Sequence, residues 1–191
     1  MSNPTTSRAF FDRLYLQEGD PWRFASSEYE LGRYEVTIQA LSSRRYSHAF
    51  EPGCSIGVLT ARLATICEGV DAIDISSIAV RQASRRCSRL PNVKIRQGAL
   101  PADVPAGSFD LIVLSEIGYY FDGAQLKTLV NHLTERMVSG SVFLAVHWLG
   151  FSPDHILSGS QVHNVISSTE KLTQDLSENH TEFLLDRWVC K

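Results

Sequence analysis

The order of elements from Ser47 onward most constrains the fold. Runs rich in β-branched and aromatic residues alternate there with segments whose apolar side chains recur at helical spacing. This alternation is typical of a parallel sheet with helices on both faces. We expect strands at His48–Glu51, Val70–Asp74, Asn92–Arg96, Phe109–Leu114 and Val142–His147.

The segments around these strands have the periodicity of amphipathic helices. The apolar faces are Leu31/Tyr34/Ile38/Leu41, Leu59/Leu63/Ile66, Val80/Ala83/Cys87/Leu90 and Leu126/Leu129/Val130/Leu133/Met137. Asp122 and the pair Ser76-Ser77 are natural N-caps for two of the predicted helices.

Two alternating segments close the chain, at Leu172–Glu178 and Glu182–Val189. Only Asn179–Thr181 separates them, which permits a hairpin and excludes a crossover helix. The sequence therefore predicts an α/β fold with a mostly parallel, seven-stranded sheet that ends in an antiparallel strand.

The length of 191 residues fits one domain. We expect a helical lead over residues 1–46, which could serve as a lid, and an α/β core over residues 47–191. The net charge of −3 gives no electrostatic footprint for nucleic acid or an anionic membrane, so a small or neutral partner fits better.

The four cysteines form no C-x-x-C pair and no cluster with histidines, so we expect neither a disulfide framework nor a metal site. The first residues lack a signal-peptide pattern, and no apolar stretch approaches the length of a spanning helix. These features favour a cytoplasmic protein without membrane insertion.

Two features at predicted strand ends indicate a cofactor site, because ligands of open parallel sheets lie beyond the carboxyl ends of the strands. Gly53 and Gly57 follow the first strand, and Ser55 between them departs from the G-x-G-x-x-G pattern of dinucleotide sites. Asp74 ends the second strand, where it can accept hydrogen bonds from ribose hydroxyls or cap the next helix.

Three motifs, E-P-G-C-S-I-G at 51–57, V-D-A-I-D-I-S at 70–76 and G-S-F-D-L-I-V-L-S-E at 107–116, resemble those of class I S-adenosylmethionine-dependent methyltransferases. That resemblance implies a Rossmann-like fold. The segments at 20–34 and 115–121, with V-H-W-L-G at 146–150, more closely resemble the rhizobial nodulation N-methyltransferases of the NodS family. The closer resemblance implies N-methylation of a chitooligosaccharide during Nod factor synthesis, at the amine of its deacetylated non-reducing-end glucosamine.

The resemblance also implies roles for residues that bind S-adenosylmethionine. Glu51, Gly53 and Gly57 would form the loop under its methionine and ribose portions, Asp74 would hold the ribose hydroxyls, and Ile75 would lie against the adenine. The position that often carries an adenine-binding acid is Ala99 here, which leaves that role to backbone groups around Gly98–Leu100. The remaining residue assigned to the cofactor is Ser115.

Two residues of the lead have alternative interpretations. Arg33 suits the methionine carboxylate, because a guanidinium binds that group with two hydrogen bonds, but it could also be a surface arginine on a helix. Trp22 could close over the cofactor or join the lead to the core.

Methyl transfer to an amine requires an unprotonated acceptor, so a nearby carboxylate or imidazole could take its proton. Glu116 and His147 follow or end the fourth and fifth strands. Glu116 could orient the amine or be a solvated carboxylate. His147 could act as a base or be a histidine with internal partners.

Aromatic side chains gather after the same two strands, at Tyr119, Tyr120, Phe121, Trp148 and Phe151. Their flat faces suit the C–H side of a sugar, although about half would instead pack against helices. We expect the acceptor contacts at Tyr119, Tyr120 and Trp148. The competing functions are a methyltransferase for another small amine or hydroxyl, a nucleotide-binding module, and a nicotinamide-dependent oxidoreductase.

Overall fold

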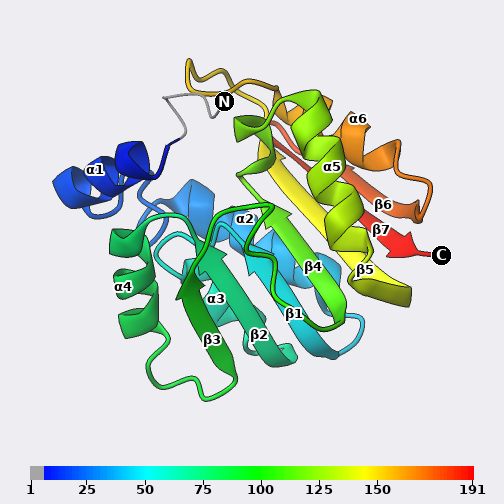
Figure 1. Ribbon diagram of the computed structural model, residues 1–191, viewed down its shortest axis with the longest axis horizontal. Helices are drawn as coiled ribbons and strands as arrows, with labels where there is room; N and C mark the ends of the chain where they lie inside the picture. The colour runs from blue at the N-terminus through cyan, green and yellow to red at the C-terminus, as the bar shows by residue number, and fades with distance from the viewer. Residues whose placement is uncertain (1–6) are drawn as a thin grey trace.

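The computed structural model describes residues 7–191 and places one seven-stranded sheet at the centre of the molecule (Figure 1). The strands are β1 Tyr46–Pro52, β2 Cys67–Asp74, β3 Val93–Gln97, β4 Phe109–Ser115, β5 Met137–Trp148, β6 Leu172–Asn179 and β7 Phe183–Cys190. Their spatial order is β3-β2-β1-β4-β5-β7-β6. All seven predicted strands are confirmed, most with bounds within two residues.

The first five strands pair in parallel, whereas β7 runs antiparallel to both of its neighbours, β5 and β6. The predicted C-terminal hairpin is therefore confirmed. The strand order reverses between β1 and β4, and this switch point is where an open α/β sheet binds its ligands.

The helices are α1 Arg8–Glu18, α2 Glu28–Leu41, α3 Val58–Leu63, α4 Ser77–Arg86, α5 Gly123–Thr134 and α6 Gly159–Ser167, with a 3₁₀ turn, η2, at Gly118–Tyr120. Helices α2 and α3 pack on one face of the sheet, and α5 and α6 pack on the other. None of these helices, within residues 7–191, combines the length and apolar character needed to cross a membrane.

The predicted helices form, with ends set by local chemistry. Asp122 and Ser76 are the N-caps of α5 and α4, as expected. Three apolar faces extend past their helices, because α3 ends at Leu63, α4 ends at Arg86 and Met137 already belongs to β5. The sequence analysis missed α6, whose first turn carries a capping box between Ser158 and Gln161.

The N-terminal lead docks across the glycine turn that follows β1. The Tyr15 hydroxyl donates to Ser55 Oγ at 2.6 Å, and Ser76 Oγ donates to Asp12 at 2.7 Å. The predicted lead ends almost where β1 begins, at Tyr46. Its first six residues lie outside the described part of the chain. Helix α1 is thereby held beside α4, at the edge of the site (Figure 1).

Candidate functional site

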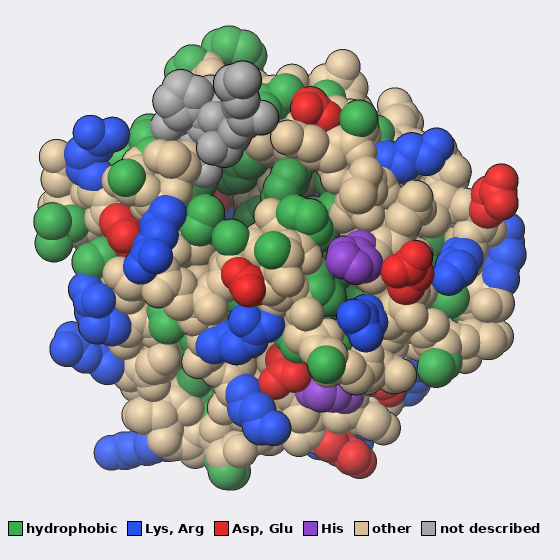
Figure 2. Space-filling view, viewed as in Figure 1, with side chains coloured by type: hydrophobic (Ala, Val, Ile, Leu, Met, Phe, Trp, Pro, Cys, Tyr) green, Lys and Arg blue, Asp and Glu red, His purple; other side chains and the backbone are tan. Residues whose placement is uncertain are grey.

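A cavity of about 1270 Å³ opens at the carboxyl ends of the central strands, between the lead and the loops after β4 and β5. Figure 2 shows the face that is hollowed, with hydrophobic side chains inside the hollow. Six carboxylates line the cavity, and no lysine or arginine among the described residues does. They are Glu30, Glu51, Asp74, Glu116, Asp122 and Asp154. Such a wall favours cationic ligands over anionic ones.

The turn after β1 is built around Gly53. Glycine adopts the φ of +75° found here at little energetic cost. A Cβ at this position would lie 2.4 Å from Ile117 Cγ2. The amides of Gly53 and Cys54 both donate to the Ile73 carbonyl, which ties the turn to the end of β2. Gly57 does not line the cavity, because it caps α3 in a left-handed conformation against Ala83 of α4.

Asp74 lies on the cavity wall at the end of β2, and it is buried. Its Oδ2 accepts from the Ser55 amide and its Oδ1 from the Ser76 amide, both at 2.8 Å. Burial raises the pKa of this carboxyl to about 6 against the lowering effect of the two amides. The side chain that caps α4 is the Ser76 hydroxyl and not the Asp74 carboxylate. Asp74 therefore keeps lone pairs for a ligand.

Glu51 is the most deeply buried carboxyl on the cavity wall. Its Oε2 has no hydrogen-bond partner among the described residues. Burial raises the pKa of Glu51 to about 8, so the group is largely protonated at neutral pH without a ligand. An unpaired buried acid of this kind has a strong need for a hydrogen-bonding or cationic partner.

The loop after β3 borders the cavity with Gly98, Ala99, Leu100 and, beside them, Ile75. Two of its amides have internal partners, because Gly98 donates to the Asp74 carbonyl and Ala99 donates to the Asp103 carboxylate. Adenine recognition by backbone groups around Gly98–Leu100 stays a prediction, and these two amides are already engaged within the protein. Ile75 and Leu100 still offer apolar surface there.

Arg33 does not lie where the sequence suggested. It is 1% exposed and absent from the cavity wall, and its guanidinium pairs with Glu30 and Glu116. These two carboxylates keep the pKa of Arg33 above its usual value despite burial. Pairing of Arg33 with a methionine carboxylate is wrong for this geometry, and so is the alternative of a surface arginine.

Glu116 lines the cavity beside Ser115 and is held by two hydrogen bonds and one ion pair. Its Oε1 pairs with Arg33 and accepts from the Trp148 amide at 2.7 Å, and its Oε2 accepts from the Tyr119 hydroxyl. Its φ is +59°, an uncommon conformation for glutamate. The interpretation of Glu116 as a solvated loop carboxylate is wrong.

His147 is fully buried and does not line the cavity. Its Nε2 accepts from the Gly118 amide at 3.1 Å, and its Nδ1 lies 3.1 Å from His163 Nε2. The far ring nitrogen of His163 lies 2.7 Å from Asp186. The interpretation of His147 as a base that faces the acceptor is wrong. The structure shows the other alternative, a histidine with internal partners, which lies behind η2.

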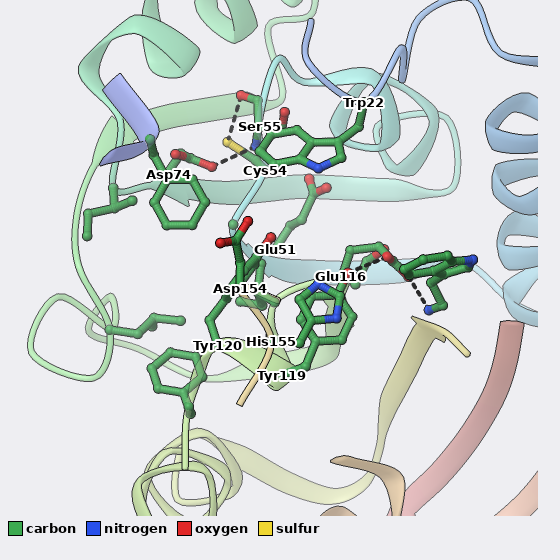
Figure 3. A pocket seen from close by; sticks show the side chains of 18 of the residues that line it. Trp22, Glu51, Cys54, Ser55, Asp74, Glu116, Tyr119, Tyr120, Asp154 and His155 are labelled. Atoms are coloured by element: carbon green, nitrogen blue, oxygen red, sulfur yellow. Dashed lines mark hydrogen bonds between the residues drawn. The ribbon is translucent and has the colours of Figure 1, made fainter. Parts of the chain in front are cut away.

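The predicted aromatic wall is present. Tyr119, Tyr120 and Trp148 line the cavity, together with Phe151, which is 87% exposed at the rim. Trp22 lines the opposite side and stacks on Phe24 at 5.5 Å, so it both covers the cavity and packs within the lead. Figure 3 shows Asp74, Ser55 and Trp22 on one side, across from Glu116, Tyr119 and His155.

Tyr15, Asp154 and His155 also lie on the cavity wall, and the sequence did not single them out individually. Asp154 and His155 follow β5 by a few residues, so the strand-end rule that singled out Trp148 would have included them. Tyr15 carries no such signal, because only the docking of α1 brings its hydroxyl to Ser55.

No group of three or more His, Cys, Asp or Glu side chains suited to a metal ion occurs within residues 7–191. The four cysteines are all buried and unpaired. Burial raises the pKa of the Cys54 thiol well above its usual value, as expected for a small apolar filler at this turn.

The model of the family described as Nodulation protein S (NodS) matches residues 7–146. Nodulation protein S of Sinorhizobium fredii (strain NBRC 101917 / NGR234) is 31% identical over 128 residues, which cover 64% of this chain and 57% of the relative. The chain spans just over half the length of the curated relatives it matches first.

Two solved structures have the same fold. A putative methyltransferase from Pseudomonas syringae is 35% identical, with a TM-score of 0.76 over 85% of this chain and 99% of that one. N-methyltransferase NodS from Bradyrhizobium japonicum WM9, in complex with S-adenosyl-L-homocysteine, is 23% identical with a TM-score of 0.84. That alignment covers 96% of this chain and 98% of the other. The Rossmann-like class I methyltransferase fold is thereby confirmed.

Proposed function

The chain belongs to the Nodulation protein S (NodS) family, and from that premise we propose its reaction and its acceptor. It is an S-adenosylmethionine-dependent N-methyltransferase. Its acceptor is the free amine of the deacetylated non-reducing-end glucosamine of a chitooligosaccharide, a precursor of Nod factors. The observation that carries the proposal is the buried, unpartnered Glu51 carboxyl beside Asp74, on the wall of an acidic cavity at the switch point of the sheet.

The residues at the ends of β1 and β2 fit S-adenosylmethionine. Glu51 offers an oxygen without a partner to the methionine ammonium group, and Asp74 offers lone pairs to the ribose hydroxyls. Gly53 lets the backbone approach without a Cβ, and Ile75 offers an apolar face to the adenine. The lead, with Trp22 on the cavity wall, would cover the bound cofactor.

The other end of the cavity suits an amino sugar. Glu116 carries lone pairs that can orient an amine, and Arg33 pairs with its Oε1 from behind the cavity wall. Tyr120, Trp148 and the exposed Phe151 supply aromatic faces for the C–H side of pyranose rings. The absence of lysine and arginine among the described residues of the wall disfavours anionic acceptors.

When bound, the cofactor supplies a methyl group activated on a sulfonium. The protein's part is to fix the acceptor nitrogen in line with that methyl group and to exclude water. Such positioning can lower the barrier by ~7–11 kcal/mol. The contacts of Glu116 serve that positioning, because two hydrogen bonds and the ion pair with Arg33 restrict its carboxylate.

Two measurements test this function. Calorimetry should show binding of S-adenosylhomocysteine and none of NAD; binding of NAD alone would point to the oxidoreductase. Transfer of a radiolabelled methyl group should occur to deacetylated chitooligosaccharides and not to fully acetylated ones. Equal labelling of the two would contradict an amine acceptor, and labelling only of simpler amines or of hydroxyl compounds would indicate another small-molecule methyltransferase.

We also propose that the protein works in the cytoplasm on a small acceptor and not on nucleic acid. Four buried, unpaired cysteines suit a reducing compartment. An acidic cavity on a protein of net charge −3 repels polyphosphate chains.

A further inference from the structure

We infer that His155 is the catalytic base that takes the proton from the acceptor amine, and that Tyr119 and Glu116 position it. The inference rests on the proposed function, because it concerns the amine acceptor at the same cavity. His155 lies on the loop between β5 and α6, on the cavity wall, and it is half-buried.

The imidazole of His155 is held by aromatic stacking. Its ring lies face to face with Tyr119, with centroids 3.6 Å apart and planes 17° apart. Tyr120 and Trp148 approach it edge to face, with centroids at 5.4 Å and 6.2 Å. In Figure 3 the rings of His155 and Tyr119 overlap beside Glu116, inside the cavity.

The backbone fixes the same arrangement. The amides of Ile156 and Leu157 both donate to the Tyr119 carbonyl, at 2.8 Å and 3.2 Å, which anchors the loop on η2. The Tyr119 hydroxyl in turn donates to Glu116. A chain of direct contacts therefore leads from the Glu116 carboxylate through Tyr119 to the imidazole, without a flexible link.

The stack uses the face of the imidazole and leaves its nitrogen-bearing edge free. Neither ring nitrogen of His155 is hydrogen-bonded to another described residue, whereas both nitrogens of His147 are engaged. Glu116 already accepts two hydrogen bonds and pairs with Arg33, which disfavours it as a base. Within residues 7–191, His155 is the one histidine on the cavity wall.

The protonation of His155 suits this role. Burial lowers its pKa from the ordinary 6.5, against the opposing effects of Glu116 and Asp154. The titratable groups around the ring are Glu116 after β4, Tyr119 and Tyr120 on η2, His147 on β5, and Asp154 on its own loop. The imidazole is therefore neutral at pH 7 and able to accept a proton.

The proton balance closes. The protonated amine gives one proton to His155, which becomes imidazolium and leaves a lone pair on the acceptor nitrogen. That pair forms the new N–C bond as the C–S bond breaks, with its electron pair remaining on sulfur. The product is a methylated ammonium, and the imidazolium returns its proton to solvent.

The first test is the pH dependence of methyl transfer to a deacetylated chitooligosaccharide by His155→Gln. The glutamine keeps the approximate size and polarity of histidine but cannot accept the proton. We expect kcat at pH 7 to fall by ~10²–10⁴-fold, the range of general-base effects. The deficit should shrink as pH rises above the pKa of the acceptor amine, because the substrate then arrives unprotonated. Affinity for S-adenosylhomocysteine should change less than about twofold.

The matched control is His132→Gln, which changes an exposed histidine on α5, and it should keep the wild-type pH profile. A His155→Gln deficit that is the same at every pH, or no deficit, would overturn the inference. A wild-type protein that methylates no amine would instead overturn the proposed function.

A second measurement does not depend on turnover. The NMR titration of the His155 ring, identified by its loss in His155→Gln, should move to lower pH when a saturating protonated amine enters the cavity. An ammonium beside the ring disfavours imidazolium. A titration curve that is unchanged by the amine would overturn the contact between His155 and the acceptor.

Discussion

Arg33 of α2 and Glu116, the residue after β4, form an ion pair that joins the N-terminal lead to the cavity wall behind Tyr119 and Trp148. The pair holds a glutamate in a left-handed conformation and presents its carboxylate to Tyr119 and Trp148. The lead thus shapes the site without contributing its arginine to the cavity wall.

Removing the guanidinium should destabilise the protein strongly. In Arg33→Met, Glu30 and Glu116 lose their buried cation, which costs about 3–5 kcal/mol in comparable cases. Urea unfolding measures the change. Arg62→Ala, which breaks a partly exposed pair with Glu35, is the control and should cost roughly 0–1 kcal/mol. Equal losses in the free energy of unfolding of the two variants would contradict a larger contribution of the Arg33 pair to stability.

A side chain at position 53 should destabilise the turn after β1. Gly53→Ala places a Cβ 2.4 Å from Ile117 Cγ2 at a φ of +75°. We expect a loss of about 1–3 kcal/mol in the free energy of unfolding. Gly32→Ala in the middle of α2 meets no atom within 4 Å and should stabilise by about 0.5–1 kcal/mol. An unchanged free energy of unfolding in Gly53→Ala would mean that the turn can shift to accommodate the added Cβ.

Asp74→Asn should weaken binding of S-adenosylhomocysteine by about 10- to 100-fold, because charge-assisted hydrogen bonds to the ribose become neutral ones. Calorimetry gives the affinity. The control is Asp71→Asn on the same strand, whose carboxylate pairs with His48 away from the cavity wall. Wild-type affinity in Asp74→Asn would show that the ribose assignment is wrong.

Binding of S-adenosylmethionine should release a proton near pH 7. The pKa of Glu51 is about 8 in the cavity without ligand, and a cationic ammonium group favours the ionised carboxylate. Affinity should therefore rise with pH up to about pH 8 and level off above it. Calorimetry in buffers of different ionisation enthalpy counts the proton. Because Asp74 has a pKa of about 6, it is mostly ionised already.

Glu51→Gln should abolish that proton release and bind the cofactor more weakly. The same variant should be more stable than wild type at pH 8. A raised carboxyl pKa favours folding at low pH, and that contribution is lost as pH rises from about 4.3 through 8. The gain is on the order of a few kcal/mol. Proton release in Glu51→Gln equal to that in wild type would assign the proton to another group.

His147 should make stability fall at mildly acid pH. Its pKa lies well below 6.5 in the folded chain, mainly because it is buried. The unfolded chain therefore binds more protons as pH drops below 6.5, and stability is lost in that range. In His147→Gln the loss between pH 7 and 5 should be smaller, as read from urea unfolding at each pH. The free energy of unfolding of His132→Gln should depend on pH as that of the wild type does. The same pH dependence in His147→Gln as in the wild type would contradict the role given to His147.

Strand positions could be predicted because burial on both faces leaves continuous apolar runs, as at residues 111–114 of β4. Helix α6 was not predicted because the segment Gly159–Ser167 begins with small polar residues. Its capping box between Ser158 and Gln161 could have indicated where it starts. The hairpin between β6 and β7 followed from loop length alone.

The residues of the site also differ in whether the sequence could predict their role. Gly53 and Asp74 could be identified because each sits at the end of a strand, and parallel strands bring their carboxyl ends to one edge. Arg33 and His147 were assigned to ligands and instead have protein partners. Nothing local distinguishes a charged side chain that meets a ligand from one that meets a carboxylate on a distant helix.

The sequence by itself determined the order of the strands and of helices α2 to α5, the antiparallel end of the sheet, and the turn that brings Gly53 beside Asp74. These depend on periodicity, turn chemistry and chain length between elements, which are local properties. Only the tertiary structure decided the partners of Glu116, His147 and His155. The energy of a buried polar group depends on which donors and rings the packing brings to it, and those come from residues far apart in the chain.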